Sequence, residues 1–342
     1  MKKELNRREF VRISAISAGV LALGGIGVKE IIKAGEAREV SETRELLGTF
    51  ITIKLIDTEM KHAKGAIEDA FSEIKRLSLV LSRHDPASEL AILNRTGTIA
   101  NASPELVGVV QKALAFTDLT GGAFDVSVLP LLTLFTDSFA DGGEAPSEKS
   151  VDAALEKVGS RFIELNDRTI SLAAPGMGLT LDGIAKGYVI DQAAALLRAR
   201  GLTQVLVEAG GDMALRGMRE DGEPWKIGVT HPRALAGYFE VIQTSNDCLA
   251  TSGDYENAFT PDYSWHHIID PRLGHSPREV ASATVIAPDT TYADALATAA
   301  VVLGISESLA LFEKLPGVQA LLINKEMKSF STSGFYGAAG PQ

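Results

Sequence analysis

Three short segments of this sequence combine residue types that could bind an anion or a metal ion. The first, LDGIAKGYVID at residues 181–191, turns from apolar residues into Asp182 and Gly183 and then into a predicted helix carrying Lys186. We expect Asp182 to cap the helix and Gly183 to let backbone approach a ligand. Lys186 would attract an anion such as phosphate beside the unpaired N–H groups of the first turn. An ordinary capped helix with one surface lysine is the alternative interpretation.

The second segment, YADALAT at residues 292–298, places Asp294 and Thr298 four residues apart on one face of a predicted helix. A carboxylate and a hydroxyl are hard oxygen ligands of the kind that Mg²⁺ prefers, and Mg²⁺ usually keeps waters and substrate phosphates in its other positions. The structural alternative is that Asp294 belongs to the N-terminal turn of the helix and that Thr298 only packs.

The third segment, WHHIIDP at residues 265–271, carries adjacent histidines before an expected short apolar strand and a turn. Strand geometry would send the rings of His266 and His267 to opposite faces, so we do not expect them to bind one metal together. One of them could act as a general base, because the pKa of histidine suits neutral pH. A purely structural histidine is the alternative.

Several classes of protein lack support in the sequence. No GxGxxG follows a predicted strand, and GxxxxGKS, HExxH and GxSxG are absent. The single cysteine, Cys248, excludes an intramolecular disulfide and a cysteine metal cluster. The formal net charge of −11 argues against nucleic acid or an anionic membrane as a general partner, because both require a basic face.

Residues 1–37 resemble a twin-arginine export signal. A basic start precedes the run NRREFVR at residues 6–12, and a weakly hydrophobic stretch rich in Gly and Ala follows. That stretch is short and poor in large side chains for a membrane-spanning helix. The pattern predicts export to the periplasm, either with a cleaved leader or with membrane association through an uncleaved one. The catalytic or binding domain is then expected over residues 38–342.

The rest of the chain mixes helices and strands without strict alternation, which favours an α+β fold over a doubly wound sheet. Helical periodicity and capping residues predict helices at 67–81, from Ser88, and at 104–121, 184–200, 291–303 and 305–315. Alternating or β-branched runs predict strands at 48–56, within 162–172, and at 204–208, 225–230, 238–244, 248–251 and 320–324. A polar stretch predicts a loop or an insertion at 136–150.

Taken together, these segments resemble the ApbE family of FAD:protein FMN transferases. The resemblance covers roughly residues 47–304, and its motifs follow one another as LGT (47–49), SRHDPASELAILN (82–94), GGAFDVSVLPLL (121–132), LDGIAKGYVID (181–191), EAGGDMALRG (208–217), WKIGVTHP (225–232), ATSGDYENAF (250–259), HHIIDPRLGHSP (266–277) and ADALAT (293–298). It implies a T-fold-related α+β fold with mixed sheets and packed helices, and an FAD cleft between two closely joined lobes.

The resemblance also implies which residues form the binding site. The FAD contacts it implies are Ala123, Phe124, Asp125, Asp182, the backbone near Ile268 and, as a positive charge near the nucleotide, Lys186. Leu47 stands where the family commonly has methionine, and His84 stands where it often has an aromatic residue, so both would pack on the flavin. The implied Mg²⁺ ligands are the Ala185 carbonyl, Asp294 and Thr298.

The implied reaction is attack by a threonine or serine hydroxyl of an acceptor protein on the FMN phosphorus of FAD, which releases AMP. Mg²⁺ would neutralise the diphosphate, the main demand of phosphoryl transfer. His267 is the candidate base and Asp270 the residue expected to orient it. The implied partner is a membrane electron-transport or exported flavoprotein subunit. With water as acceptor the same site gives an FAD pyrophosphatase, and without catalysis it gives a periplasmic flavin-binding protein.

Overall fold

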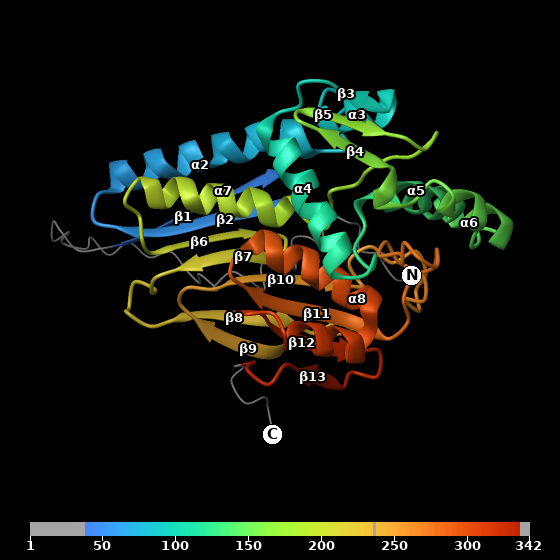
Figure 1. Ribbon diagram of the computed structural model, residues 1–342. Helices are drawn as coiled ribbons and strands as arrows, with labels where there is room; N and C mark the ends of the chain where they lie inside the picture. The colour runs from blue at the N-terminus through green and yellow to red at the C-terminus, as the bar shows by residue number, and fades with distance from the viewer. Residues whose placement is uncertain (1–37, 235–236, 336–342) are drawn as a thin grey trace.

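An eight-stranded antiparallel sheet forms the centre of the computed structural model, which describes residues 38–234 and 237–335 (Figure 1). Its strand order is β1 (Arg38–Leu46), β2 (Thr49–Asp57), β6 (Val205–Ala209), β7 (Asp212–Arg216), β10 (Cys248–Gly253), β11 (Val280–Ala287), β12 (Gln319–Asn324) and β13 (Ser329–Ser331). The predicted leader and its arginine pair lie outside the described residues.

Three long helices cover one face of this sheet. Helix α7 (Ala185–Ala199) lies between α2 (Met60–Leu81) and α8 (Thr290–Phe312), and contacts both (Figure 1). Alanine is frequent among the buried residues of these helices, α7 also buries Gly187, and small side chains let helix backbones approach closely. This close approach matters for the site, because the N-terminal turns of α7 and α8 carry most of the predicted ligands.

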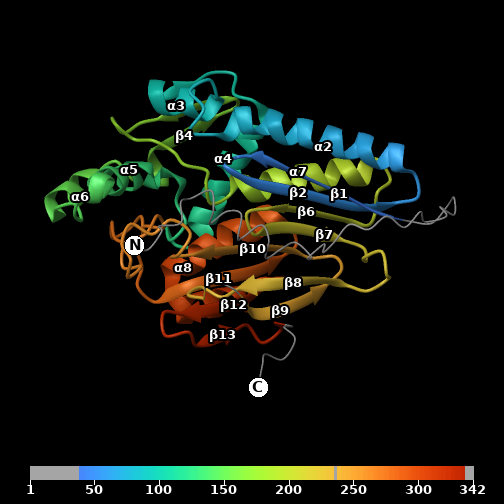
Figure 2. The same ribbon diagram turned by 180° about the vertical axis from the view of Figure 1, so that it is seen from behind.

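A hairpin of β8 (Trp225–Thr230) and β9 (Tyr238–Thr244) packs on the opposite face of the central strands (Figure 2). Alternation along the central strands explains the two layers: Leu249 and Ile286 pack with the hairpin residues Trp225 and Ile242, whereas their chain neighbours point into the helical layer. The described fold is therefore α+β, as predicted, with the sheet lying between the three helices and the hairpin.

The remaining elements form an extension beside the large sheet. They are α3 (Glu89–Thr96), α4 (Pro104–Leu119), α5 (Leu129–Ser138), α6 (Glu148–Leu155), the sheet of β3 (Thr98–Ile99), β5 (Thr169–Leu172) and β4 (Ile163–Asn166), and the 3-10 turns η1 (Val126–Val128), η2 (Ala140–Gly142) and η3 (Ser160–Phe162). Phe135 and Ile269 belong to a separate apolar cluster that joins α5 and α6 to the loop after Trp265.

Two sequence predictions need correction. The predicted loop at 136–150 is shorter, because α5 continues to Ser138 and α6 begins at Glu148 after the capping residue Ser147. The predicted strand after His267 does not form: His266 makes one isolated bridge to Ala258, and the residues that follow enter the turn at 270–274. The predicted division of the late helices is confirmed, since Gly304 interrupts α8 with φ 78° and ψ 179°.

Among the described residues, α8 is the one helix long and apolar enough to cross a membrane, by length and composition alone. Its most apolar window is 61 % buried inside the fold, as expected for the core helix of a globular domain.

Candidate functional site

The N-terminal turns of α7 and α8 are held together by direct backbone approach. A Cβ atom at Gly187 would lie 2.3 Å from the Thr290 carbonyl oxygen, so only glycine fits at this crossing. The Gly187 N–H donates to Asp294 Oδ2 at 3.0 Å. Asp191, one turn further along α7, accepts from the backbone N–H groups of Thr290 and Thr291, each at 2.8 Å. These contacts fix Asp294 against the start of α7.

The predicted metal ligands meet at this crossing. Asp294 is 2 % exposed, and burial, with the nearby Asp212 carboxylate, raises its pKa to about 7. Thr298, one turn along α8, has its Oγ1 2.9 Å from a Cβ built on Gly183, and Ala185 begins α7 between Gly183 and Gly187. A buried carboxylate whose only hydrogen bond among the described residues comes from a backbone N–H, next to a hydroxyl, suits a hard cation.

Lys186 lies beside this group but has a protein partner. Its Nζ donates to Asp212 Oδ2, from the start of β7. Burial alone would lower the pKa of Lys186, but the carboxylates of Asp212 and Asp294 outweigh burial and raise it. Lys186, next to Ala185 in α7, is therefore a charged and still partly exposed cation.

Asp182 does not cap α7, contrary to prediction. Ile184 precedes the helix without a side-chain cap, because the chain makes a further turn in which Ile184 N and Ala185 N both donate to Leu181 O. The Asp182 carboxylate, 51 % exposed, accepts instead from Arg83 Nε at 2.7 Å. This ion pair brings the 82–94 segment to the start of α7.

His267 lies close enough to Asp182 and Lys186 for their charges to act on its imidazole. Burial, followed by the neighbouring His266, lowers its pKa to about 4, while the Asp182 carboxylate acts in the opposite direction. Its backbone N–H donates to Asn257 O at 3.0 Å, and its buried Nδ1 has no hydrogen-bond partner among the described residues. The imidazole is thus neutral at pH 7.

Asp270 does not bond to His267, so the expected orienting contact is absent among the described residues. Its Oδ1 accepts from Arg272 N and Nε at 2.8 and 2.9 Å, and its Oδ2 accepts from Arg272 Nη2 at 2.8 Å. The carboxylate therefore shapes the turn at 270–274 instead. Arg272 in turn packs near Gly122, its Cγ 3.6 Å from a Cβ built there, and so connects this turn to the GGAFD segment.

The other predicted flavin contacts divide into those near the crossing and those apart from it. Phe124 lies 3.3 Å from a Cβ built on Gly183, beside the predicted metal ligand Thr298. Asp125 points into the protein, where it accepts from Ser127 and from Ser160 N at 2.9 Å. Ala123 and Ile268 are buried, Leu47 occupies the β1–β2 turn with φ 55°, and His84 is exposed.

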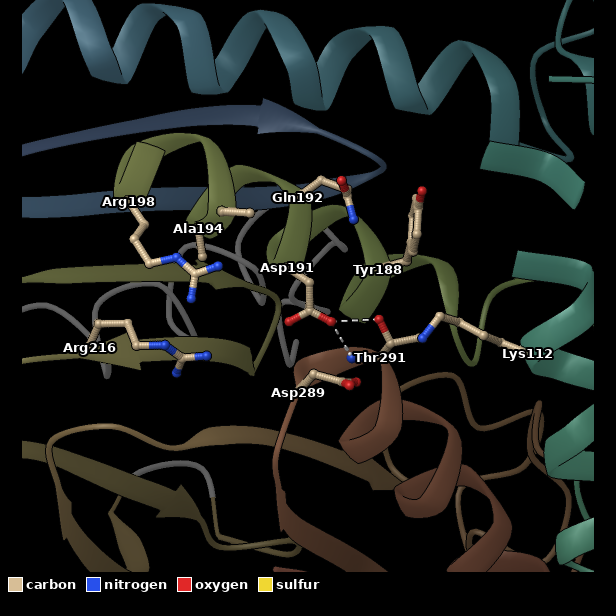
Figure 3. A pocket seen from close by; sticks show the side chains of 10 residues that line it. Lys112, Tyr188, Asp191, Gln192, Ala194, Arg198, Arg216, Asp289 and Thr291 are labelled. Carbon is tan, nitrogen blue, oxygen red and sulfur yellow. Dashed lines mark hydrogen bonds between the residues drawn. The ribbon is translucent and has the colours of Figure 1, made fainter. Parts of the chain in front are cut away.

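Two cavities border these elements. One, of about 370 Å³, is lined by Gly121, Gly122, Asp125, Arg161 and Arg272, and thus by two of the motif segments. The other, of about 270 Å³, is lined by residues of α7 and of the start of α8 and by none of the predicted site residues. Figure 3 shows Arg198 and Arg216 on one side of it and Lys112 on the other, with Asp191 and Asp289 between them. Its acids cap α8, so this cavity supports the crossing and we assign it no chemistry.

Segments far apart in the sequence therefore meet around the start of α7. Thr298 and Phe124 lie within 3.3 Å of a Cβ built on Gly183, Lys186 pairs with Asp212, and Asp182 pairs with Arg83. Ser252 Oγ lies 3.2 Å from Thr298 Oγ1, which adds the 250–259 segment. Sequence reasoning missed Arg83, Asp191 and Asp212, whose roles depend on partners 26 to 100 residues away.

The sequence also matches a known family along most of its length. A model of the ApbE family matches residues 47–322. The chain belongs to the ApbE family. It is 31 % identical over 340 residues to the FAD:protein FMN transferase of Treponema pallidum, covering 92 % of this chain and 93 % of that protein. It is 27 % identical over 335 residues to the FAD:protein FMN transferase of Salmonella typhimurium, covering 94 % and 95 %.

Solved ApbE structures share the fold. The ApbE protein of Thermotoga maritima superposes with a TM-score of 0.79 at 30 % identity, covering 86 % of this chain and 97 % of that one. The apo flavinyl transferase ApbE of Pseudomonas stutzeri gives a TM-score of 0.78 at 26 % identity, covering 88 % and 97 %. The predicted family and its α+β fold are confirmed.

Proposed function

We propose that this protein transfers the FMN moiety of FAD to a threonine or serine hydroxyl of an acceptor protein and releases AMP. The observation that carries the proposal is the meeting of the 181–191 and 293–298 segments at the α7–α8 crossing in a member of the ApbE family. Relatives named FAD:protein FMN transferase match this chain over nearly its whole length, which supports the same substrate here.

The acceptor oxygen attacks the FMN phosphorus, and the bond from that phosphorus to the AMP oxygen breaks. His267 is our candidate for the group that takes the hydroxyl proton, because its imidazole is neutral and close enough to Asp182 and Lys186 for their charges to act on it. The negative charge of bound FAD would raise its pKa from about 4 towards the range useful for a base. Lys186 would hold the nucleotide end by charge attraction.

Asp294, Thr298 and the Ala185 carbonyl would hold Mg²⁺. When bound, the ion would neutralise the diphosphate and stabilise the leaving phosphate. The fit rests on the buried carboxylate of Asp294, which no lysine or arginine contacts directly within the described residues, and on the hydroxyl beside it. The tight packing at Gly183 and Gly187 would keep these ligands in place.

We also propose that the protein is exported and acts on the periplasmic side, because residues 6–12 resemble a twin-arginine signal. The acceptor would then be a membrane or exported flavoprotein subunit.

The test is incubation with FAD, Mg²⁺ and a candidate acceptor, followed by in-gel flavin fluorescence and an AMP assay. Fluorescence on the acceptor supports transfer. AMP and FMN without labelled acceptor would favour the FAD pyrophosphatase, and neither product would favour a flavin-binding protein. His267→Ala should lose transfer while still binding FAD, and transfer at the wild-type rate with saturating FAD would refute the assignment of the base.

A further inference from the structure

A buried ion-pair cluster lies where three strands end. Asp254, directly after β10, is 0 % exposed, and its Oδ1 and Oδ2 accept from Arg233 Nη1 and Nη2 at 2.8 and 2.7 Å. Lys325, directly after β12, places its Nζ 3.3 Å from Asp254 Oδ2. Arg233 follows β8, so the cluster joins the hairpin to the main sheet. None of these residues belongs to the predicted site.

The same cations also hold the loop that follows Asp254. The guanidinium of Arg233 lies 4.0 Å from the ring centroid of Tyr263, and Lys325 Nζ donates to Tyr263 O at 2.7 Å. Tyr263 has φ 59°, a left-handed conformation that a bulky residue keeps only when its surroundings impose it. The cluster therefore fixes both ends of the segment from 254 to 263.

That loop carries the candidate base at its far end. The chain returns through a bridge between Ala258 and His266 and a hydrogen bond from Phe259 N to Trp265 O at 2.7 Å. His267 N then donates to Asn257 O at 3.0 Å, inside the same loop. His266, between the cluster and His267, has a pKa lowered to about 4, first by burial, and the charges of Lys325, Asp254 and Arg233 all act on it.

We propose that the Arg233–Asp254 ion pair is a positioning element that holds the loop 254–266, and with it the ring of His267, in the place where the ring can take the proton of the acceptor hydroxyl. The inference rests on the proposed function. The pair touches no reacting group. It acts through the loop: without Arg233, the buried Asp254 carboxylate loses two guanidinium hydrogen bonds and keeps only Lys325, and the Tyr263 ring loses its cation, so the loop rearranges.

The experiment compares the full chain with Arg233→Met and Arg233→Lys. Arg233→Met should lower kcat for FMN transfer by about 100-fold, the loss expected when a catalytic group moves by about 1 Å. Its Kd for FAD should stay within about threefold of wild type, because the loop change does not remove a nucleotide contact. Arg233→Lys keeps the charge but not the two parallel hydrogen bonds, so it should recover part of the lost kcat.

A second readout separates positioning from general destabilisation. Hydrogen exchange should become faster at amides 255–267 in Arg233→Met and stay unchanged in α2. The matched control is Arg219→Met, which removes an exposed ion pair with Asp221 in the β7–β8 turn and should change neither kcat nor exchange in the loop.

Wild-type kcat and wild-type exchange in Arg233→Met would overturn the proposal, as would a uniform rise in exchange over the whole chain. If Arg233→Met does not fold, Arg233→Lys decides the case: an unchanged kcat with unchanged loop exchange would overturn the proposal. If the wild-type chain transferred no FMN, the proposed function would fail, whereas faster exchange confined to 255–267 would still show that the pair holds the loop.

Discussion

Gly187→Ala should damage both stability and activity, although alanine is the better helix former. In the interior of a helix alanine is favoured over glycine by about 1 kcal/mol. At this position, however, the added Cβ would lie 2.3 Å from Thr290 O, 2.6 Å from Thr290 C and 2.8 Å from Thr291 Cα, all backbone atoms of α8. Backbone cannot rotate away as a flexible side chain can, so the steric cost decides the outcome.

The magnitude follows from the distance that the helices must move. Ordinary van der Waals contact begins near 3.4 Å, so α7 and α8 must separate by about 1 Å at Gly187. Overpacking of this kind costs about 1–3 kcal/mol or more, which exceeds the gain in helix propensity. The same shift would pull Asp294 from the Gly187 N–H, and about 1 Å of misplacement typically lowers turnover by about 100-fold.

The assay is thermal unfolding together with steady-state FMN transfer. We expect Tm to fall by a few degrees and kcat to fall by about 100-fold. Gly65→Ala is the matched control, since Gly65 lies on the exposed face of α2 with nothing within 4 Å of an added Cβ, and this change should stabilise the protein by up to about 1 kcal/mol. Equal stability and activity of Gly187→Ala and wild type would refute the account of the crossing.

Three further changes probe other parts of the site. Asp294→Asn keeps an acceptor for the Gly187 N–H, so the variant should fold, as circular dichroism would show. It loses the negative charge that would bind Mg²⁺, so it should lose Mg²⁺-dependent turnover. Retained turnover would contradict the metal assignment. Burial lowers the pKa of His266 from 6.5 in the unfolded chain to about 4 in the folded one. Protonation therefore favours unfolding: the stability that the neutral ring contributes is complete above pH 6.5, and up to about 3 kcal/mol of it is lost as the pH falls towards 4. Between pH 7 and pH 5 the Tm of wild type should therefore fall further than that of His266→Gln, and equal falls would argue against this effect. Arg83→Met removes an exposed ion pair with Asp182 and should change the free energy of unfolding by less than about 1 kcal/mol in chemical denaturation, whereas a loss of several kcal/mol would show a larger structural role.

Much of the fold could be predicted because its helices and outer strands have clear periodicity. Helix α2 buries Ile67, Phe71 and Ile74 at helical spacing, and the predicted helix over 184–200 corresponds closely to α7. Strand β11 was missed because all eight of its residues are buried, so the run shows no alternation of polar and apolar side chains. Strand β1, at the sheet edge, was also missed, because none of its residues is fully buried and its run REVSETREL is mostly polar.

The site was only partly predictable, because the spacing of residues along one helix does not show which side chains a distant segment places beside them. The pair Asp294 and Thr298 could be predicted from its spacing of four residues, and the structure places it at Gly183 and Gly187. The partners of Asp182 and Lys186 could not be, because Arg83 and Asp212 are 99 and 26 residues away. The orienting role given to Asp270 was wrong because the nearby Arg272 satisfies its carboxylate.

The most direct test of the central claim is intact-mass spectrometry of an acceptor flavoprotein incubated with this chain and FAD, with AMP measured in the same samples. With Mg²⁺, the proposed reaction predicts an acceptor heavier by one FMN moiety and one AMP released for each acceptor modified. Chelation of the metal, or Asp294→Asn, should remove both products. Release of AMP and free FMN from an acceptor of unchanged mass would contradict the transfer reaction.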